Sequence, residues 1–355
     1  MRRHRLGAVL IGILVVCATV VISAAPASAH GLGGLKPTDY QTRLGPIRPS
    51  VPGITLVAVD LGTRLELTNT TAHDVIVEGY DGEPYLRVGP RGVFENTRSP
   101  ATYFNRSVNP SGPAPKQADA KAPPVWKQTS DGTTARWHDH RAHYMGTVDP
   151  PVVQRDRSHP HVIDTFRIGM HTDGQALSAT GHIVWVPPPS PWPWVIAALV
   201  VAAIVFALSR TRVYRTVFAV VLVVLTAVEL AHVIGLWGAS SASGVTKLVQ
   251  SAYSIGGILL GVLALVWMRR RGTEAAIPLV LVATIFLFVA GGLADLTSLG
   301  ASQLPTTFPN WLARLLVTTM LGLGAGLAAA AAFRLRPQPP PTRPVRRTAP
   351  ARVTS

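Results

Sequence analysis

The stretch Pro187-Pro188-Pro189-Ser190-Pro191 divides this chain of 355 residues into two parts of different chemistry. Before it, short runs of alternating apolar and polar residues are separated by residues typical of turns. After it, long apolar segments follow one another. Proline-rich linkers are extended and semi-rigid. We therefore expect a spacer over 187–192 that holds an N-terminal β domain at a fixed height above a membrane-embedded C-terminal part.

The C-terminal part has the pattern of a multi-pass membrane protein. Its apolar segments are 193–209, 213–237, 249–268, 276–299 and 312–333. Each is close to the ~20 residues that a helix needs to cross a bilayer. Tryptophans lie near the segment ends, as in an aromatic belt: Trp192, Trp194, Trp237, Trp267 and Trp311. The sequence therefore predicts a bundle of five transmembrane helices over 193–335, with the lipid bilayer as its partner.

The distribution of charge predicts the orientation. Arginine is concentrated at 210–215, at 269–271 and after residue 333, whereas the loops 238–246 and 297–310 contain no lysine or arginine. Because basic loops stay on the cytoplasmic side, we expect the N-terminal domain outside the cell membrane. A disordered basic tail, 336–355, then lies inside.

The formal net charge of +15 belongs to these membrane-flanking clusters and to the first five residues. Residues 30–191 contain 16 lysines and arginines and 15 aspartates and glutamates, so this part is nearly neutral. We therefore predict no nucleic-acid partner.

The first 29 residues have the pattern of a secretory signal peptide. Met1-Arg2-Arg3-His4-Arg5 is basic, 6–25 is apolar, and Ala27-Ser28-Ala29 is a cleavage motif. An apolar run of this length is also compatible with a membrane span, and either interpretation places the next domain outside. Cleavage would make His30 the N-terminal residue, whose amine and imidazole together can chelate Cu(II). The single cysteine, Cys17, lies in this segment, so the chain cannot form an internal disulfide.

Residues 30–186 are expected to form an extracytoplasmic antiparallel β-sandwich of the immunoglobulin or cupredoxin type. Strand-like runs are found at 54–59, 64–68, 74–78, 85–88, 92–95, 134–138, 162–168 and 181–186. We expect 32–52 to be an irregular arm and 110–124 an exposed loop, because both are rich in proline and glycine or alanine.

Histidine is concentrated in the segment Trp137-His138-Asp139-His140-Arg141-Ala142-His143-Tyr144-Met145. Imidazole is the commonest transition-metal ligand in proteins, and a nearby thioether favours copper. We predict a copper site formed by His30, His138, His140 and His143, with Met145 as a soft ligand; zinc also suits such a set. His138 and His140 would share one face of a strand.

A second pair, His159 and His161, has the same spacing and is predicted as a possible second metal site. The alternative for all these histidines is structural, with hydrogen bonds or ion pairs to neighbouring aspartates. A catalytic acid–base role is a third alternative.

Four ionisable residues lie near the outer ends of the apolar segments: Glu229, His232, Asp295 and Arg314. Ionisable residues inside a membrane are expensive and usually functional. Glu229 and His232 share a helix face. We predict a proton or metal relay, with a structural ion-pair cluster as the alternative.

The layout of a signal peptide ending before His30, an outer β domain and a helical membrane part resembles bacterial copper-handling envelope proteins of the CopC and CopD type. Actinobacteria carry fused or neighbouring versions of these proteins, and they also carry uncharacterised membrane proteins with this layout. The resemblance implies copper binding, transfers His30 as a ligand, and implies other copper-handling envelope proteins as partners.

Common catalytic motifs are absent from the sequence. It contains no His-Glu-x-x-His, Gly-x-Ser-x-Gly, Walker or Cys-x-x-Cys pattern. We therefore expect a non-enzymatic copper-handling protein of the cell envelope. A structural or interaction domain is the alternative, and a membrane-bound oxidase or hydrolase is a third possibility.

Overall fold

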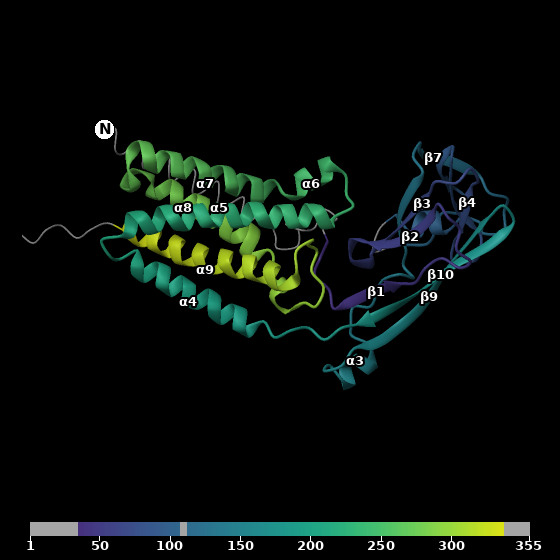
Figure 1. The fold of residues 1–355 in the computed structure, drawn as a ribbon, viewed down its shortest axis with the longest axis horizontal. Coiled ribbons are helices and arrows are strands. Elements are labelled where there is room, and N and C mark those ends of the chain that lie inside the picture. The colour runs from purple at the N-terminus through teal and green to yellow at the C-terminus, as the bar shows by residue number, and fades with distance from the viewer. Residues whose placement is uncertain (1–34, 107–111, 337–355) are drawn as a thin grey trace, which may run out of the picture.

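The computed structural model describes residues 35–106 and 112–336 of the chain. An N-terminal β domain is followed by a C-terminal helical part, and the two lie end to end (Figure 1). The predicted signal segment 1–29, the predicted ligand His30 and the tail after residue 336 lie outside the described residues.

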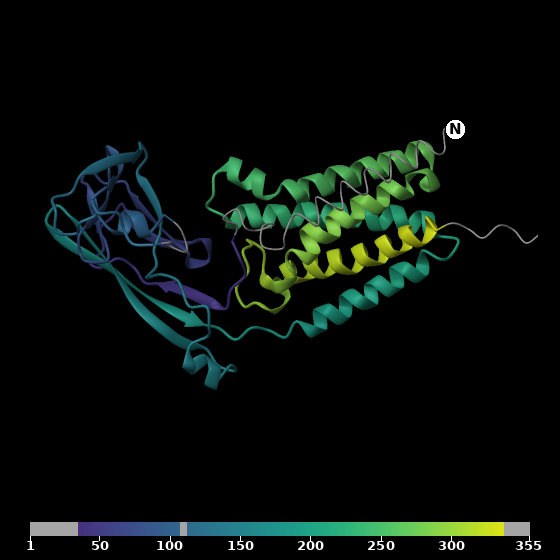
Figure 2. The same cartoon turned by 180° about the vertical axis from the view of Figure 1, so that it is seen from behind.

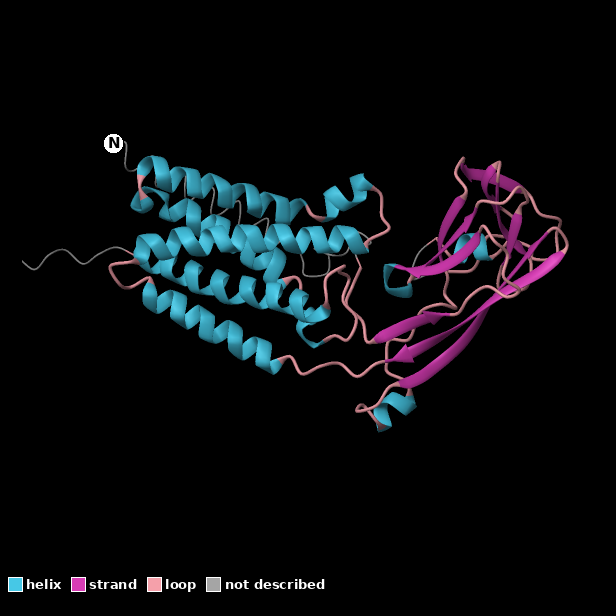
Figure 3. Cartoon of the chain, in the orientation of Figure 1, coloured by secondary structure: helices cyan, strands magenta, loops and turns pink. Residues whose placement is uncertain are grey.

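The β domain consists of two antiparallel sheets. Its strands are β1 (Tyr40–Leu44), β2 (Ile54–Val59), β3 (Arg64–Asn69), β4 (Val75–Glu78), β5 (Pro84–Gly89), β6 (Gly92–Asn96), β7 (Trp126–Ser130), β8 (Thr134–His138), β9 (His161–Thr172) and β10 (Gln175–Trp185). The larger sheet has the order β1-β10-β9-β4-β5-β6-β7, and the smaller sheet has the order β2-β3-β8. Figure 3 shows that the strands and the membrane helices occupy separate ends of the molecule.

Alternation along the strands builds a single apolar core between the two sheets. Leu65 and Leu67 of β3 are fully buried, as is Val77 of β4 and Ile168 of β9. Residues two apart on a strand point to the same face, so these strands each bury one face. The prediction of an antiparallel β domain is confirmed.

Four elements of the β domain were not expected. β1 lies within the segment predicted to be irregular, and it pairs with β10 from Tyr40↔Trp185 to Leu44↔Gly181. β7 follows the proline-rich loop and pairs with β6. A short helix, α2 (Ala101–Phe104), and another, α3 (Pro151–Arg155), close two of the connections. The prediction of a wholly irregular arm was therefore wrong: the hydrogen bonds that make β1 a strand come from β10, far away in the sequence.

The helical part contains α4 (Trp192–Leu208), α5 (Tyr214–Ala239), α6 (Gly244–Gln250), α7 (Ala252–Arg271), α8 (Thr273–Leu287), the π-helical turn η2 (Phe288–Leu293), the 3-10 turn η3 (Leu296–Gly300) and α9 (Asn310–Arg334). Within the described residues, four segments are long and apolar enough to cross a membrane: α5, α7, the stretch from Thr273 to Gly300, and α9. The apolar helix α4 is shorter, with 17 residues. The structure thus fits a multi-pass membrane protein.

Glycine allows α4 to lie close against α9, as Figure 2 shows from behind. A Cβ at Gly322 would lie 2.8 Å from the carbonyl oxygen of Ala198, and a Cβ at Gly326 would lie 2.6 Å from that of Ala202. Two glycines four residues apart are a common contact surface between membrane helices. The opposite side of α4 exposes apolar side chains such as Leu199.

Hydrogen bonds join the β domain to loops at the nearer end of the bundle. The backbone N–H groups of Thr38 and Gln303 each donate to the other residue's carbonyl, at 3.1 and 2.9 Å. The carboxylate of Asp39 accepts from the N–H of Ser302 at 2.7 Å. Asp60 accepts from Ser241 twice, from N–H at 2.8 Å and from the hydroxyl at 2.6 Å. The domain is therefore docked on the bundle and not only tethered by the 187–192 spacer.

Candidate functional site

Each of the three clustered histidines in the β domain is held by a backbone carbonyl. His138 Nδ1 lies 2.8 Å from Thr63 O, His140 Nε2 lies 3.1 Å from Phe104 O, and His143 Nδ1 lies 3.1 Å from Asp139 O. β8 ends at His138, so His140 lies in the following turn. The expectation of a shared strand face was wrong because the strand stops between the two residues.

The side chain of Asp139 holds the segment from Trp137 to Arg141 in its turn. Its carboxylate is fully buried. It accepts hydrogen bonds from Trp137 Nε1 at 3.0 Å and from the Arg141 guanidinium at 2.8 Å. A buried carboxylate needs such partners to offset its lost hydration. The Trp-His-Asp-His-Arg run is therefore a turn built around one buried ion pair.

His140 and His143 are brought together, with ring centroids 5.7 Å apart. The Nε2 atom of His143 is buried without a hydrogen-bond partner in the described structure. Burial lowers the pKa of His143 and of His138, so both favour the neutral form. Met145 is 39% exposed. In the residues that the structure covers, no three His, Cys, Asp or Glu side chains are grouped to hold a metal ion. Copper binding with His30 therefore stays a prediction.

His159 and His161 are both bonded to Asp156. His159 Nδ1 lies 2.9 Å from Asp156 Oδ2, and His161 Nε2 lies 2.6 Å from the Asp156 backbone oxygen. Hydrogen bonds from Ser158, and then from His159, lower the pKa of the Asp156 carboxyl group. These contacts favour the ion-pair interpretation of this pair over a metal site.

The polar residues of the helical part form a more unusual arrangement. His232 of α5 lies with Nε2 2.9 Å from Oδ2 of Asp295, which follows η2. Glu229, almost one helical turn earlier on α5, is fully buried, and neither carboxylate oxygen has a hydrogen-bond partner among the described residues. Arg314 Nη2 donates to the Ala301 carbonyl at 2.6 Å. The structure thus pairs His232 with Asp295, while Glu229 makes no hydrogen bond of ordinary geometry with the described residues and has His232 and Ser254 as its polar neighbours.

The π-helical turn brings a thioether to Glu229. A Cβ added to Gly291, within η2, would lie 1.7 Å from Met320 Cε and 1.9 Å from Glu229 Oε2. The end of the Met320 side chain and the Glu229 carboxylate therefore meet over the bare Cα of Gly291. Single π turns inside helices frequently mark functional sites. Met320 was not among the residues predicted for this site, because its apolar sequence neighbours do not distinguish it from a core residue. The adjacent glycines Gly291 and Gly292 were the only sequence feature here that indicated a close approach of another chain segment.

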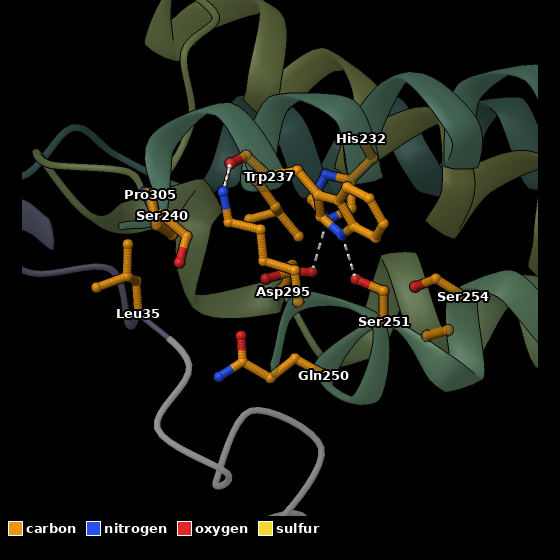
Figure 4. A pocket seen from close by; sticks show the side chains of 12 residues that line it. Leu35, His232, Trp237, Ser240, Gln250, Ser251, Ser254, Asp295 and Pro305 are labelled. Carbon is orange, nitrogen blue, oxygen red and sulfur yellow. Dashed lines mark hydrogen bonds and ion pairs between the residues drawn. The ribbon is translucent and has the colours of Figure 1, made fainter. Parts of the chain in front are cut away.

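A small cavity lies beside His232 and Asp295, at the end of the bundle that faces the β domain (Figure 4). Its volume is about 60 Å³, enough for a few water molecules or a small ion but not for an organic ligand. His232 and Asp295 line its inner part, and Leu35, Ser240 and Pro305 line it from the arm and the loops.

Two hydrogen bonds fix the wall of this cavity. Trp237 Nε1 donates to Ser251 Oγ at 2.7 Å, and Lys247 Nζ donates to the Trp237 carbonyl at 2.8 Å. Both bonds join α5 to the α6–α7 region. Part of the wall is therefore built from polar groups that are already engaged. Glu229 does not line the cavity, but its neighbours His232 and Ser254 do.

A comparison of the chain with protein-family models, with curated proteins and with solved structures finds no match.

Proposed function

We propose that this chain is a copper-handling membrane protein of the cell envelope, and that the cation enters the helical bundle at Glu229, His232 and Met320. The β domain is outside, of immunoglobulin or cupredoxin type, and α4 completes a set of five membrane-crossing helices. The cation arrives from the β-domain side through the small cavity. Other copper-handling envelope proteins are its expected partners.

The observation that carries the proposal is the buried Glu229 carboxylate without a partner. Burying an ionised carboxylate without compensation costs several kcal/mol or more. Evolution retains such groups in membranes chiefly for function. A proton or a cation must therefore accompany Glu229. The cavity is lined by its neighbours His232 and Ser254 and would bring a cation close to the carboxylate.

The neighbouring donors favour copper as the cation. A carboxylate accepts hydrogen bonds, so in the neutral imidazole the contact with Asp295 makes His232 Nε2 the N–H nitrogen and leaves the lone pair on Nδ1. A histidine oriented by a carboxylate in this way is typical of metal ligands. The thioether of Met320 selects soft ions such as Cu(I) over zinc, calcium or magnesium.

The donors form two neighbouring pairs, His232 with Asp295 and Glu229 with Met320, and not one closed centre. A site through which an ion passes has to bind it weakly enough to release it. An open arrangement is therefore consistent with transfer of the cation, while a permanent cofactor would require a closed ligand shell.

The test is a Cu(I) titration of the full chain in lipid nanodiscs, with a competing chelator as the readout of affinity. Glu229→Gln and Met320→Leu each keep the side-chain volume and remove one donor. The matched control is Glu274→Gln, because Glu274 is an exposed carboxylate of the same bundle. Loss of one ligand is expected to weaken binding by about 10–100-fold, with no change for the control.

Three results would contradict the proposal. Equal Cu(I) affinity of wild type and Glu229→Gln would remove the site from this cluster. Affinity that depends on His140 and His143 alone would move the site to the β domain. Absence of copper binding, together with proton uptake abolished in Glu229→Gln, would make the cluster a proton relay.

A further inference from the structure

A groove with a volume of about 440 Å³ lies in the β domain, away from the membrane cluster. This volume is in the range of ordinary ligand sites. The groove lies where the two sheets part: β7 is the last strand of the larger sheet and β8 the last strand of the smaller one.

The groove follows the edge of β8 and not one of its faces. All residues of β8, from Thr134 to His138, line the groove. Their side chains alternate between the core and the opposite face, with Ala135 and Trp137 buried and Arg136 exposed. Residues from both faces can line the same groove only if it runs along the strand edge. No described strand other than β3 pairs with β8, so one row of its backbone groups faces the groove.

The rim of the groove is positively charged. Arg64, Arg106 and Arg136 line it, against one carboxylate, Glu95. Two of these arginines already form ion pairs. Arg136 is paired with Glu66, and Arg64 Nη1 lies 3.6 Å from Asp60 Oδ2.

Arg106 is the guanidinium that remains available. Arg106 is exposed, and its guanidinium carbon lies 4.7 Å from the centroid of the Tyr103 ring. It makes no ion pair with the described residues. Glu95, which lines the same groove, is an electrostatic neighbour of Arg106, so an anionic group at this end would compete with Glu95 for a guanidinium that makes no ion pair within the described part of the chain.

A buried donor is also available in the groove wall. Asn105 is 6% exposed, and its side-chain oxygen accepts from the Tyr80 hydroxyl. Its Nδ2 group has no hydrogen-bond partner in the described part of the chain. The Tyr85 hydroxyl, which lines the same groove, is close enough to interact with the Asn105 side chain, so a bound carbonyl would compete with that hydroxyl for the Nδ2 donor.

From these observations we infer that the β7–β8 groove binds an extended acidic peptide segment of a partner protein by strand addition to β8. The peptide backbone pairs with the free edge, its acidic side chains reach Arg106, and a carbonyl accepts from Asn105 Nδ2. The inference is independent of copper binding and identifies the β domain as an interaction module.

The experiment uses the full chain in nanodiscs and a labelled peptide of alternating valine and glutamate with blocked ends, followed by fluorescence anisotropy. We expect saturable binding. Replacing glutamate with glutamine in the peptide, or Arg106→Gln in the protein, is expected to weaken it at least about tenfold. N-methylation of alternate peptide bonds on the side that pairs is expected to abolish it. Arg167→Gln is the control, because Arg167 is exposed on β9 and does not line the groove.

Each alternative outcome overturns the inference. Equal binding of the N-methylated peptide, or full competition by a small dicarboxylate such as glutarate, would identify a small-anion site without strand addition. Equal binding of the glutamine peptide would remove the charge argument. Absence of binding would show that the edge of β8 takes no acidic strand.

Discussion

The membrane cluster consists of Glu229, His232, Asp295 and Met320. Replacing Gly291 with alanine adds one methyl group, and we expect this substitution to disrupt the contact between Glu229 and Met320. The added Cβ would lie 1.7 Å from Met320 Cε and 1.9 Å from Glu229 Oε2. Optimal contacts between heavy atoms are ~3.5–4.0 Å. The ends of both side chains would therefore have to move by about 2 Å, which separates the carboxylate from the thioether.

The magnitude follows from the packing. Inserting a methyl group into a filled interior costs ~1–3 kcal/mol, and Met320 is fully buried. The free energy of unfolding should fall by this amount. Cu(I) affinity should fall by about 10–100-fold, the range seen when the support of a metal ligand is lost.

Chemical unfolding in nanodiscs and the chelator titration measure the two effects separately. Gly256→Ala is the matched control: Gly256 lies within α7, and its added Cβ would have no atom within 4 Å. This control is expected to be neutral or to stabilise the helix by ~0.5–1 kcal/mol. Adding Met320→Ala to Gly291→Ala should restore part of the stability but none of the affinity. The reasoning is refuted if Gly291→Ala unfolds and binds Cu(I) like the wild type.

Three further predictions concern the rest of the molecule. Asp60→Asn should weaken the docking of the β domain on Ser241 by about 1 kcal/mol, because a neutral amide accepts hydrogen bonds more weakly than a carboxylate. Amide hydrogen exchange of residues 240–243 should become faster. Unchanged exchange would contradict the role of this contact. Burial lowers the folded-state pKa of His138 and His143, so their contribution to stability is complete above the unfolded value of about 6.5 and is lost as pH falls below it. A pH series of unfolding with chelator present should show this loss, and it should be smaller when both are changed to Gln. Gly326→Val should cost ~1–3 kcal/mol by forcing α4 away from α9, and an unchanged thermal unfolding midpoint would argue against the close packing at Gly326.

The sequence predicted most of the β domain because local patterns and the fold agree there. The alternation of apolar and polar residues predicted β2 to β6 and β8 to within one or two residues of their observed bounds. It could not give β1, whose sequence Tyr-Gln-Thr-Arg-Leu has little apolar character and is a strand because β10 pairs with it. β7 is exposed over most of its length and carries no alternating signal.

The sites show the same limit more strongly. Helical spacing placed Glu229 and His232 on one face, and both residues are buried on α5; His232 contacts Asp295, which the sequence put at a similar depth. The contact between Met320 and Glu229 was not predictable, because it depends on a π turn that shifts the register of the helix at Gly291. In the β domain, spacing alone could not reveal that backbone carbonyls hold the clustered histidines.

The most direct test of the copper proposal is X-ray absorption spectroscopy at the copper K-edge on the full chain loaded with Cu(I) in nanodiscs. The account predicts a shell that contains sulfur, lost in Met320→Leu, together with an imidazole contribution lost in His232→Asn. A spectrum with nitrogen ligands only, unchanged in both variants, would contradict the membrane site and return the search to the histidines of the β domain.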